Sequence, residues 1–269
     1  MRRSIFLAAI VGAGLLAAWH LGLSPGELVP DRSRWVLLRR FLVAALTPAL
    51  RSQSDLGTSV LPRAWEAAVH TVVFATAAIS LSVVAGSVLG VLASERWWRL
   101  FPATRALRPV LFGATRVLIG FMRSIHEILW AIVLLAAFGL NTVAAVIAIS
   151  IPYAGTLAKI FSEILDETED DAAEALRFAG AGSLATFVFG LVPRALPDMG
   201  AYTFYRFECA LRSAAILGFF GFPTLGKLIY ESFGELYFRE AWTYLYALFV
   251  LIVAVEWWSG ALRQRLTVA

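Results

Sequence analysis

Charged side chains that stand inside long apolar runs are the first residues of this sequence that could do chemistry. They occur near the middle of the chain and again in the run 197–218, and they are Arg123, Ser124 (a polar neighbour), His126, Glu127, Arg206, Glu208 and Arg212. Charges in apolar surroundings are costly, so they pair with one another or line a polar pathway. Glu208 and Arg212 lie four residues apart on one helix face and can pair. The residues predict either internal salt bridges or an arginine that attracts an anion.

The polar loop, residues 164–192, is the second candidate site and the longest polar stretch between apolar runs. Thr168 is expected to cap a short helix over residues 169–179, with Asp171 as its capping-box partner. The acidic residues at the start of this helix suit the positive end of its dipole. The alternative is a plain solvated connector.

Two glycines and a proline punctuate the end of this loop. Gly180 and Gly182 can adopt the left-handed backbone conformation that ends a helix. A second short helix is predicted over residues 183–191, and it should end before Pro193 because proline breaks a helix interior.

The amino-acid composition indicates that these elements lie in a membrane and not in water. Of the 269 residues, 59% are hydrophobic and 16% are charged, whereas soluble domains are about half apolar and a quarter charged. The apolar runs are long and continuous, which favours membrane-spanning helices over a barrel. The expected fold class is an all-α membrane protein, a polytopic helical bundle. The net charge of +4 is attributed to arginines at cytoplasmic membrane edges and not to nucleic-acid binding.

About six membrane-spanning helices are predicted. They cover residues 4–23, 66–93, 126–139, 142–163, 197–218 and 241–260. Residues 106–122 should form a partial segment before the third span, and residues 31–52 a helix that lies in the membrane interface. The organisation is therefore an N-terminal part, 1–65, followed by a transmembrane core, 66–269.

Arginines set the expected orientation of the bundle. They gather at the N-terminus, after the last span and in the 94–108 loop, where they are Arg96, Arg99, Arg105 and Arg108. Because arginine is enriched on the cytoplasmic side, both termini and the polar loop are expected in the cytoplasm. Lys159 and Glu163, four residues apart, are expected to pair near the inner end of the fourth span.

The spacing in the polar loop resembles a family signature. Glu174-Ala175, then Gly180, then Pro193 is similar to the loop of binding-protein-dependent ABC importer permeases. The departures are mild: Leu176 completes the Glu-Ala triplet, Val192 precedes the proline, and Gly190 replaces a usual isoleucine. The resemblance implies a type I ABC importer permease fold in which this loop is a coupling helix that docks into a separate ATPase subunit.

Longer stretches narrow the resemblance to the phosphonate-type subgroup. They are residues 123–131, 202–208 and 212–218, within a likeness over about residues 60–265. His126 stands where a proline is usual, and the following glycine-rich run, 218–226, also departs from the subgroup. The implied cargo is a phosphonate, phosphite or related small oxyanion.

The resemblance also implies partners and a location. These are a second permease copy (a homodimer), two ABC ATPase subunits, a periplasmic or lipid-anchored substrate-binding protein and membrane lipid, in the bacterial inner membrane. No cofactor, metal or catalytic residue is expected on this chain, and ATP with Mg belongs to the partner ATPase.

Two rival functions are weighed against this one. An ion-coupled secondary transporter of a small anion would predict paired hydropathy repeats, and none is found. An intramembrane enzyme would need a nucleophile–base pair or metal ligands, which the scattered histidines do not supply. The stretch 221–227 matches part of a phosphate-binding loop, but Leu228 stands where Ser or Thr must bind Mg²⁺.

Overall fold

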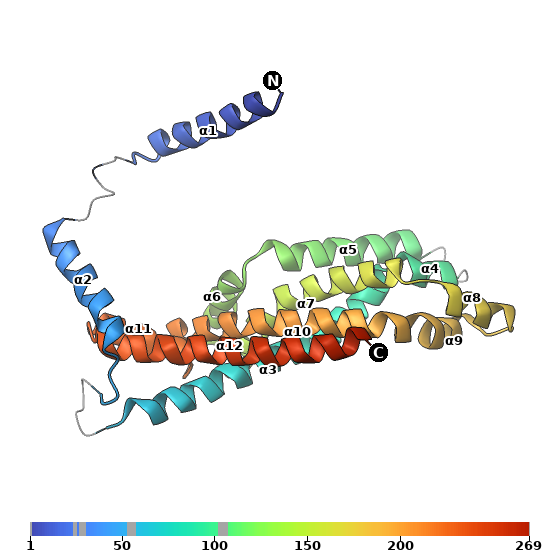
Figure 1. The fold of residues 1–269 in the computed structure, drawn as a ribbon. Coiled ribbons are helices and arrows are strands. Elements are labelled where there is room, and N and C mark those ends of the chain that lie inside the picture. Colours follow the sequence, from blue (N-terminus) through green and yellow to red (C-terminus); the bar gives the residue numbers. More distant parts are fainter. Residues whose placement is uncertain (1, 24–25, 27–30, 53–57, 102–106, 269) are drawn as a thin grey trace. The chain divides into compact units, whose positions relative to one another are not determined.

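The structure, a computed structural model, describes residues 2–23, 26, 31–52, 58–101 and 107–268. The chain divides into two compact units, residues 1–47 and 48–269. Helices make up both units in Figure 1, and the described residues hold no strand beyond one isolated bridge between Arg51 and Ser59. The predicted all-α class is confirmed. Of the arginines in the 94–108 loop, Arg105 lies outside the described residues.

The first unit consists of two helices. The apolar helix α1 (Arg2–His20) coincides with the first predicted span and is shorter than the spans of the second unit. The arginine-bearing helix α2 (Arg32–Leu46) ends earlier than predicted. Pro48 explains the early end, because a proline disfavours helical backbone in the residue before it.

Three helices of the second unit are long and apolar enough to cross a membrane. They are α3 (Val60–Ala93), α7 (Thr142–Glu167) and α12 (Phe238–Val268). The helix α3 begins six residues before the predicted span, since Pro62 fits a first helical turn, where its missing N–H needs no partner. A tight turn precedes α7, with Gly139 at φ 74° and Asn141 accepting a hydrogen bond from the Val143 N–H at 2.9 Å.

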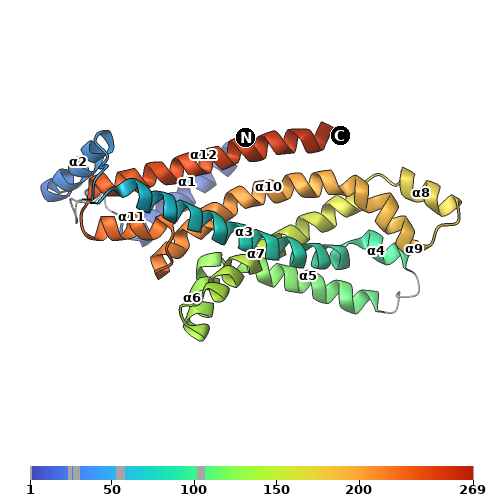
Figure 2. The same ribbon diagram turned by 90° about the horizontal axis from the view of Figure 1, so that it is seen from below.

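The third predicted span is wrong as a separate element. Helix α5 (Arg108–Ser124) and helix α6 (Glu127–Phe138) meet at an angle of 91°, and Figure 2 shows α6 turned away from the line of α5. With 12 residues, α6 is only about 18 Å long, too short to cross a bilayer alone. Together the two helices are long and apolar enough for one broken span.

The fifth span is longer than predicted. Helix α9 (Ser183–Ala185) continues through a π-helix (Thr186–Leu191), α10 (Val192–Ile216) and a 3₁₀ turn (Leu217–Phe220). The predicted helix end before Pro193 is wrong, because the π-helix shifts the hydrogen-bond register just before the proline: the Val192 N–H bonds to Phe187 O.

Helix α11 (Leu225–Gly234) follows at 46° to this span. The part of the chain that the structure describes therefore holds three straight spans, or five when each bent pair counts as one, besides the shorter α1. The chain is a multi-pass membrane protein.

Small residues bring α3 and α7 close together. A Cβ atom built on Gly86 would lie 2.8 Å from Leu157 Cβ, and one on Gly90 would lie 3.0 Å from Phe161 Cβ. The Ser82 hydroxyl donates to Ser150 O at 3.1 Å. Without a hydrophobic force between helices in lipid, such close packing and interhelical hydrogen bonds stabilise the pair.

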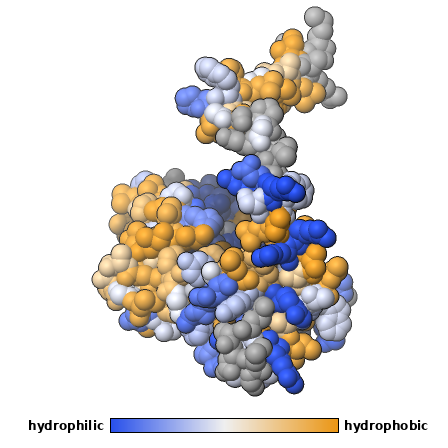
Figure 3. Space-filling model, turned by 90° about the vertical axis from the view of Figure 1, so that its left-hand side faces the viewer, coloured by the Kyte–Doolittle hydropathy of each residue, from blue (hydrophilic) through white to orange (hydrophobic). Residues whose placement is uncertain are grey.

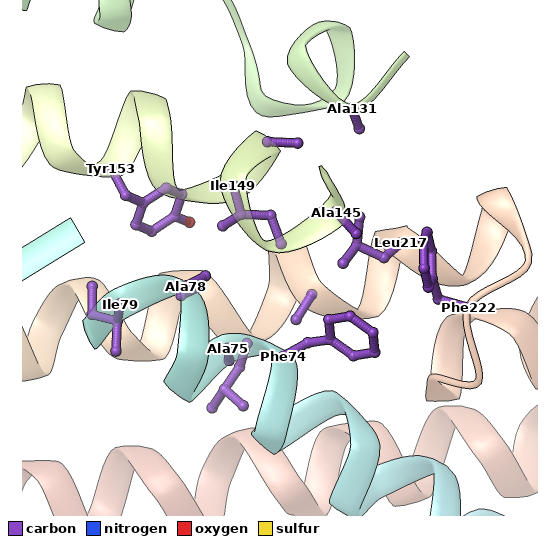
Figure 4. Close-up of a cluster of buried hydrophobic side chains, with 14 of the residues drawn as sticks. Phe74, Ala75, Ala78, Ile79, Ala131, Ala145, Ile149, Tyr153, Leu217 and Phe222 are labelled. Atoms are coloured by element: carbon purple, nitrogen blue, oxygen red, sulfur yellow. The ribbon is translucent and has the colours of Figure 1, made fainter. Parts of the chain in front are cut away.

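The main apolar core joins α3, α6, α7 and α10. Figure 4 shows it as Phe74 and Ile79 from α3 facing Ile149 and Tyr153 from α7, with Leu217 at its edge. Tyr153 is the polar member of this core: its ring is buried while its hydroxyl needs a partner.

The polar elements lie at opposite ends of the second unit. Both ribbon views place α4 (Glu95–Leu100), α8 (Asp171–Phe178) and α9 at one end and α11 at the other. Figure 3 faces the α11 end, where hydrophilic side chains stand beside broad apolar areas. The exposed charged residues there include Arg63, Glu66 and Glu231.

Candidate functional site

Helix α8 forms the predicted short helix of the polar loop and ends on Gly180. Gly180 has φ +84°, and its N–H bonds to Arg177 O at 3.0 Å while the Ala181 N–H bonds to Leu176 O at 2.9 Å. These two bonds are a Schellman motif, which satisfies the last carbonyls of the helix. Gly182 has φ −68°, so only Gly180 is left-handed.

The predicted capping box is wrong. Thr168 ends α7, where its hydroxyl donates to Ile164 O at 2.7 Å. Asp170 is the N-cap residue of α8 and makes no side-chain cap bond. Its carboxylate forms an ion pair with Arg96 instead, so a contact between distant residues replaces the local cap.

Arg96 fastens α4 to the polar loop. Its Nε donates to the backbone oxygen of Asp166 at 3.1 Å, and its backbone N–H donates to Asp166 Oδ1 at 3.1 Å. The Ser94 hydroxyl donates to the same carboxylate oxygen at 2.6 Å. With the ion pair to Asp170, these charge-assisted bonds hold the end of α3, α4 and both sides of the α7–α8 junction in one geometry.

The inner face of α8 packs on the π-helix. A Cβ atom on Gly190 would lie 2.9 Å from Ala173 Cα, so the absence of a side chain at Gly190 lets α8 approach. Leu165, Phe187 and Leu191 surround Ala173 in a small apolar core. This core makes α8 a rigid extension of α7 and α10.

The outer face of α8 is open. Asp171, Glu174, Ala175 and Phe178 are all exposed and follow the spacing i, i+3, i+4, i+7 of a single helix face. We call these four residues the docking face. Phe178 is 90% exposed, and burying a phenylalanine is favourable by about 1.5–3 kcal/mol. Pro193 is exposed on α10, apart from this face.

The predicted pair of Glu208 with Arg212 is wrong. Glu208 is buried, and its carboxylate accepts from Arg263 of α12 at 3.1 Å. Arg212 is exposed and its guanidinium lies 3.5 Å from Cys209 Sγ. The two residues share a helix face, but the tertiary partner on α12 takes the carboxylate.

A chain of hydrogen bonds links Glu127 to Tyr153. The Ser213 hydroxyl donates to Glu127 Oε1 at 2.8 Å and lies 2.9 Å from the Tyr153 hydroxyl. A serine hydroxyl has one hydrogen to donate, and Ser213 donates it to the carboxylate of Glu127. The Tyr153 hydroxyl must therefore be the donor in its hydrogen bond with Ser213. Glu127 also lies 3.4 Å from His126 Nε2.

Arg206 lies on the ring of Tyr153. Its guanidinium carbon is 4.3 Å from the ring centroid, within cation–π range. Its Nε atom is buried and has no hydrogen-bond partner in the described part of the chain. Arg206 and Glu208, two residues apart, thus face different helices, α7 and α12.

Two further arginines accompany Arg206, and we call Arg123, Arg206 and Arg212 the arginine cluster. None of them forms an ion pair with a carboxylate among the residues described. Arg123 and Arg206 both act electrostatically on the Tyr202 hydroxyl. Arg206 and Glu127 both act electrostatically on the Tyr153 hydroxyl.

The other predicted residues are accounted for separately. Ser124 donates to Phe121 O at 2.8 Å and so closes the end of its own helix. Lys159 and Glu163 pair as predicted. The stretch 221–227 follows a 3₁₀ turn and not a strand, which agrees with its rejection as a phosphate-binding loop.

The sequence analysis did not identify several residues of these sites. Phe178 falls on the i+7 position of the docking face, so helical periodicity could have identified it. Tyr153, Ser213, Arg263 and Arg96 carry no local signal, because each acts on a residue more than 50 positions away.

Several known proteins are similar to this chain in sequence. HtxE of Stutzerimonas stutzeri, a candidate phosphite transport system permease protein, is 31% identical over 170 residues, 63% of this chain and 65% of the relative. The phosphate-import permease protein PhnE of Mycolicibacterium smegmatis is 30% identical over 200 residues, 74% of this chain and 36% of the relative. The chain thus spans less than two thirds of the length of both.

A third relative is matched almost throughout. The phosphite transport system permease protein PtxC of Stutzerimonas stutzeri is 24% identical over 266 residues, 96% of this chain and 88% of the relative.

Solved structures show the same fold. An amino acid ABC transporter chain has a TM-score of 0.63 at 17% identity, covering 76% of this chain and 94% of that chain. A chain of the methionine ABC transporter MetNI, in an inward-facing conformation, has a TM-score of 0.63 at 18% identity, covering 75% and 94%. The predicted type I ABC importer permease fold is confirmed.

Residues 86–268 match the sequence profile described as "Binding-protein-dependent transport system inner membrane component". The match includes the polar loop and the arginine cluster. A transport family also confirms the prediction that the chain is not an enzyme. The chain belongs to the family of inner membrane components of binding-protein-dependent transport systems.

Proposed function

We propose that this chain is the membrane-spanning permease subunit of an ATP-driven importer. A small oxyanion, such as a phosphonate or phosphite, is delivered by an external binding protein and crosses between two copies of the chain. Two separate ATPase subunits hold ATP and Mg²⁺, and each engages one polar loop. Both termini lie in the cytoplasm.

The docking face of α8 carries the proposal. Its exposed carboxylates and the 90% exposed Phe178 form a surface with no cover among the described residues, on a helix that Arg96 and Gly190 fix rigidly. A rigid helix transmits the movement of a bound partner to the spans, whereas a flexible loop would absorb it. Closure of the ATPases on ATP would swing α8 together with α7 and α10, and hydrolysis would reset them.

The cargo class is supported by charge. The arginine cluster has three guanidinium groups that form no ion pair with a carboxylate among the described residues, and the carboxylate of Glu208 is neutralised by Arg263. An excess of positive charge within membrane-spanning helices favours an anionic cargo. The phosphite and phosphate named for the relatives are oxyanions of this class.

Exposure of the cluster supports a second copy. Arg123 and Arg212 are exposed on the isolated chain, and charged groups that faced lipid at this depth would be costly. A second copy that covers this face, with a polar path between the two, removes that cost.

Co-purification after mild detergent extraction tests the coupling. The ATPase subunit should accompany the wild type and be lost from Glu174→Arg and Gly180→Pro, and it should be reduced in Phe178→Ala. Glu167→Arg makes the same charge change on an exposed residue outside the docking face and should keep the ATPase. If crosslinked wild type recovers no ATPase, an ion-coupled secondary transporter becomes the better explanation.

A further inference from the structure

Within the arginine cluster, the buried Nε atom of Arg206 lacks a hydrogen-bond partner among the described residues, although buried polar groups are nearly always paired. The guanidinium carbon of Arg206 lies 4.3 Å above the Tyr153 ring. An aromatic face holds a guanidinium in place without using any of its N–H donors, so the donors stay available.

Nearby carboxylates do not fill this position. Glu208 is committed to Arg263 at 3.1 Å. Glu127 accepts from Ser213 at 2.8 Å and has His126 at 3.4 Å. The hydrogen-bond chain from Glu127 through Ser213 to the Tyr153 hydroxyl fixes the ring between Arg206 and Glu127, both of which act on Tyr153 electrostatically.

Membrane depth excludes a lipid headgroup as the missing partner. Arg206 stands nine residues after the start and twelve before the end of the predicted span 197–218, about 14 and 18 Å along the helix, so it lies near the middle of that span. Tyr153, its platform, is 4% exposed in the main core. A group that pairs with Arg206 must therefore travel along the path between the spans.

We propose that Arg206 binds an oxygen edge of a tetrahedral oxyanion during its passage, and that Tyr153, tied to Ser213 and Glu127, is a positioning residue that keeps Arg206 from pairing with Glu127. This inference rests on the proposed function. Guanidinium donors match two oxygens of a phosphoryl-type group at once, whereas an ammonium acts as a point charge. Arg123 acts electrostatically on the Tyr202 hydroxyl, as Arg206 does, and adds positive charge near the same site.

The test uses the complete transporter, with its ATPase and binding protein, in liposomes. ATP-driven uptake is measured separately for phosphite, methylphosphonate and inorganic phosphate, and the best of the three serves as the probe. Arg206→Gln should lower the maximal uptake rate about tenfold or more, as expected for a lost charged hydrogen bond. Arg206→Lys should recover little of it. ATPase co-purification should stay at the wild-type level, because Arg206 lies outside the docking face.

Rescue separates positioning from simple packing. Tyr153→Leu removes the ring, so Arg206 should turn to Glu127 and uptake should fall as in Arg206→Gln. The double variant Tyr153→Leu with Glu127→Gln removes the competing carboxylate and should recover uptake at least severalfold over Tyr153→Leu alone. Tyr153→Phe keeps the ring and should lose less than Tyr153→Leu.

Each result has a distinct meaning. Wild-type uptake with an unchanged rate in Arg206→Gln would overturn the assignment of Arg206 and leave the importer function standing. Absence of rescue in the double variant, in properly inserted protein, would overturn the positioning role of Tyr153. Failure of the wild type to import any of the three anions with all partners present would overturn the proposed function and this inference with it.

Discussion

At the scale of single residues, two glycines of the polar loop differ only in backbone conformation. Gly180 has φ +84° and Gly182 has φ −68°, and a Cβ atom at either would meet nothing within 4 Å. An alanine at Gly180 should cost about 1 kcal/mol, because L-residues disfavour left-handed backbone. We expect Gly180→Ala to weaken ATPase co-purification about fivefold and Gly182→Ala to leave it unchanged. Equal effects of the two variants would mean that the Schellman turn does not shape the docking face.

At Gly86, in contrast, the effect of a substitution depends on the space around the Cβ atom and not on the backbone conformation. Its Cβ would lie 2.8 Å from Leu157 Cβ and 3.2 Å from Ala154 O, so Gly86→Ala must push α3 from α7. Overpacking of this kind costs about 1–3 kcal/mol, and the thermal unfolding temperature in detergent should fall by several degrees. Gly113→Ala on α5 meets open space and gains helix propensity, so its unfolding temperature should stay equal or rise.

Prediction of side-chain partners from sequence succeeds where the partners are local. Lys159 and Glu163 pair because four-residue spacing on a helix brings them together and nothing else competes. Glu208 and Arg212 have the same spacing, but the carboxylate of Glu208 forms its ion pair with Arg263 of α12. Sequence spacing shows which residues can meet on one helix, and only packing shows which distant helix supplies a better partner.

At the scale of elements, α4 links the end of α3 to the polar loop, and no sequence pattern predicts this link. Arg96 joins it to Asp166 and Asp170, while Arg99 on the same helix pairs only with Glu95, within α4. We expect Arg96→Gln to lower ATP-driven uptake about fivefold or more, because loss of charged hydrogen bonds frees the polar loop from α3. ATPase co-purification should persist, since the docking face remains intact.

The matched control for this prediction is Arg99→Gln, which removes the same charge one helical turn away on an exposed side chain. It should transport as the wild type does. Similar losses in both variants would assign the effect to total charge at this membrane edge and not to the link between α4 and the polar loop.

The ends of helices, like side-chain pairs, can be predicted from sequence where their causes are local. Apolar run length predicts α7 within four residues and the start of α12 within three, although α12 continues eight residues beyond the predicted end. Gly180 and Pro48 end their helices through their own backbone preferences. The polar residues 123–127 predict that α5 ends there, but an interruption of an apolar run does not predict the 91° angle between α5 and α6. Pro193 misleads for a related reason: the π-helix before it removes the clash that a regular helix would suffer.

At the scale of the whole molecule, hydropathy and charge predict a multi-pass helical bundle without reference to any contact. They do not predict that two of its spans are bent pairs, nor that the arginine cluster opens on an exposed face of the single chain. Those properties arise from how α5, α6, α7 and α10 pack. The exposed cations and the uncovered docking face are two surfaces of the described chain that lack a partner, and each corresponds to a partner in the proposed transporter.

Orientation in the membrane connects these surfaces. Helix α11 and the polar loop occupy opposite ends of the second unit (Figures 1 and 2), so they must lie on opposite sides of the bilayer. The chain has one cysteine, Cys209, and Cys209→Ala therefore gives a background in which single cysteines can be labelled. Glu235→Cys follows α11, and Arg99→Cys lies on α4 beside the polar loop.

In intact spheroplasts, a membrane-impermeant maleimide should label Glu235→Cys at once and Arg99→Cys only after permeabilisation. Arginine enrichment on the cytoplasmic side is the physical reason for this orientation. The wild type, with Cys209 half-buried within a span, should label poorly in both conditions. The reverse labelling would put α8 outside the cell, where no ATPase can bind it, and would overturn the coupling role of the docking face even if the chain still carried an anion.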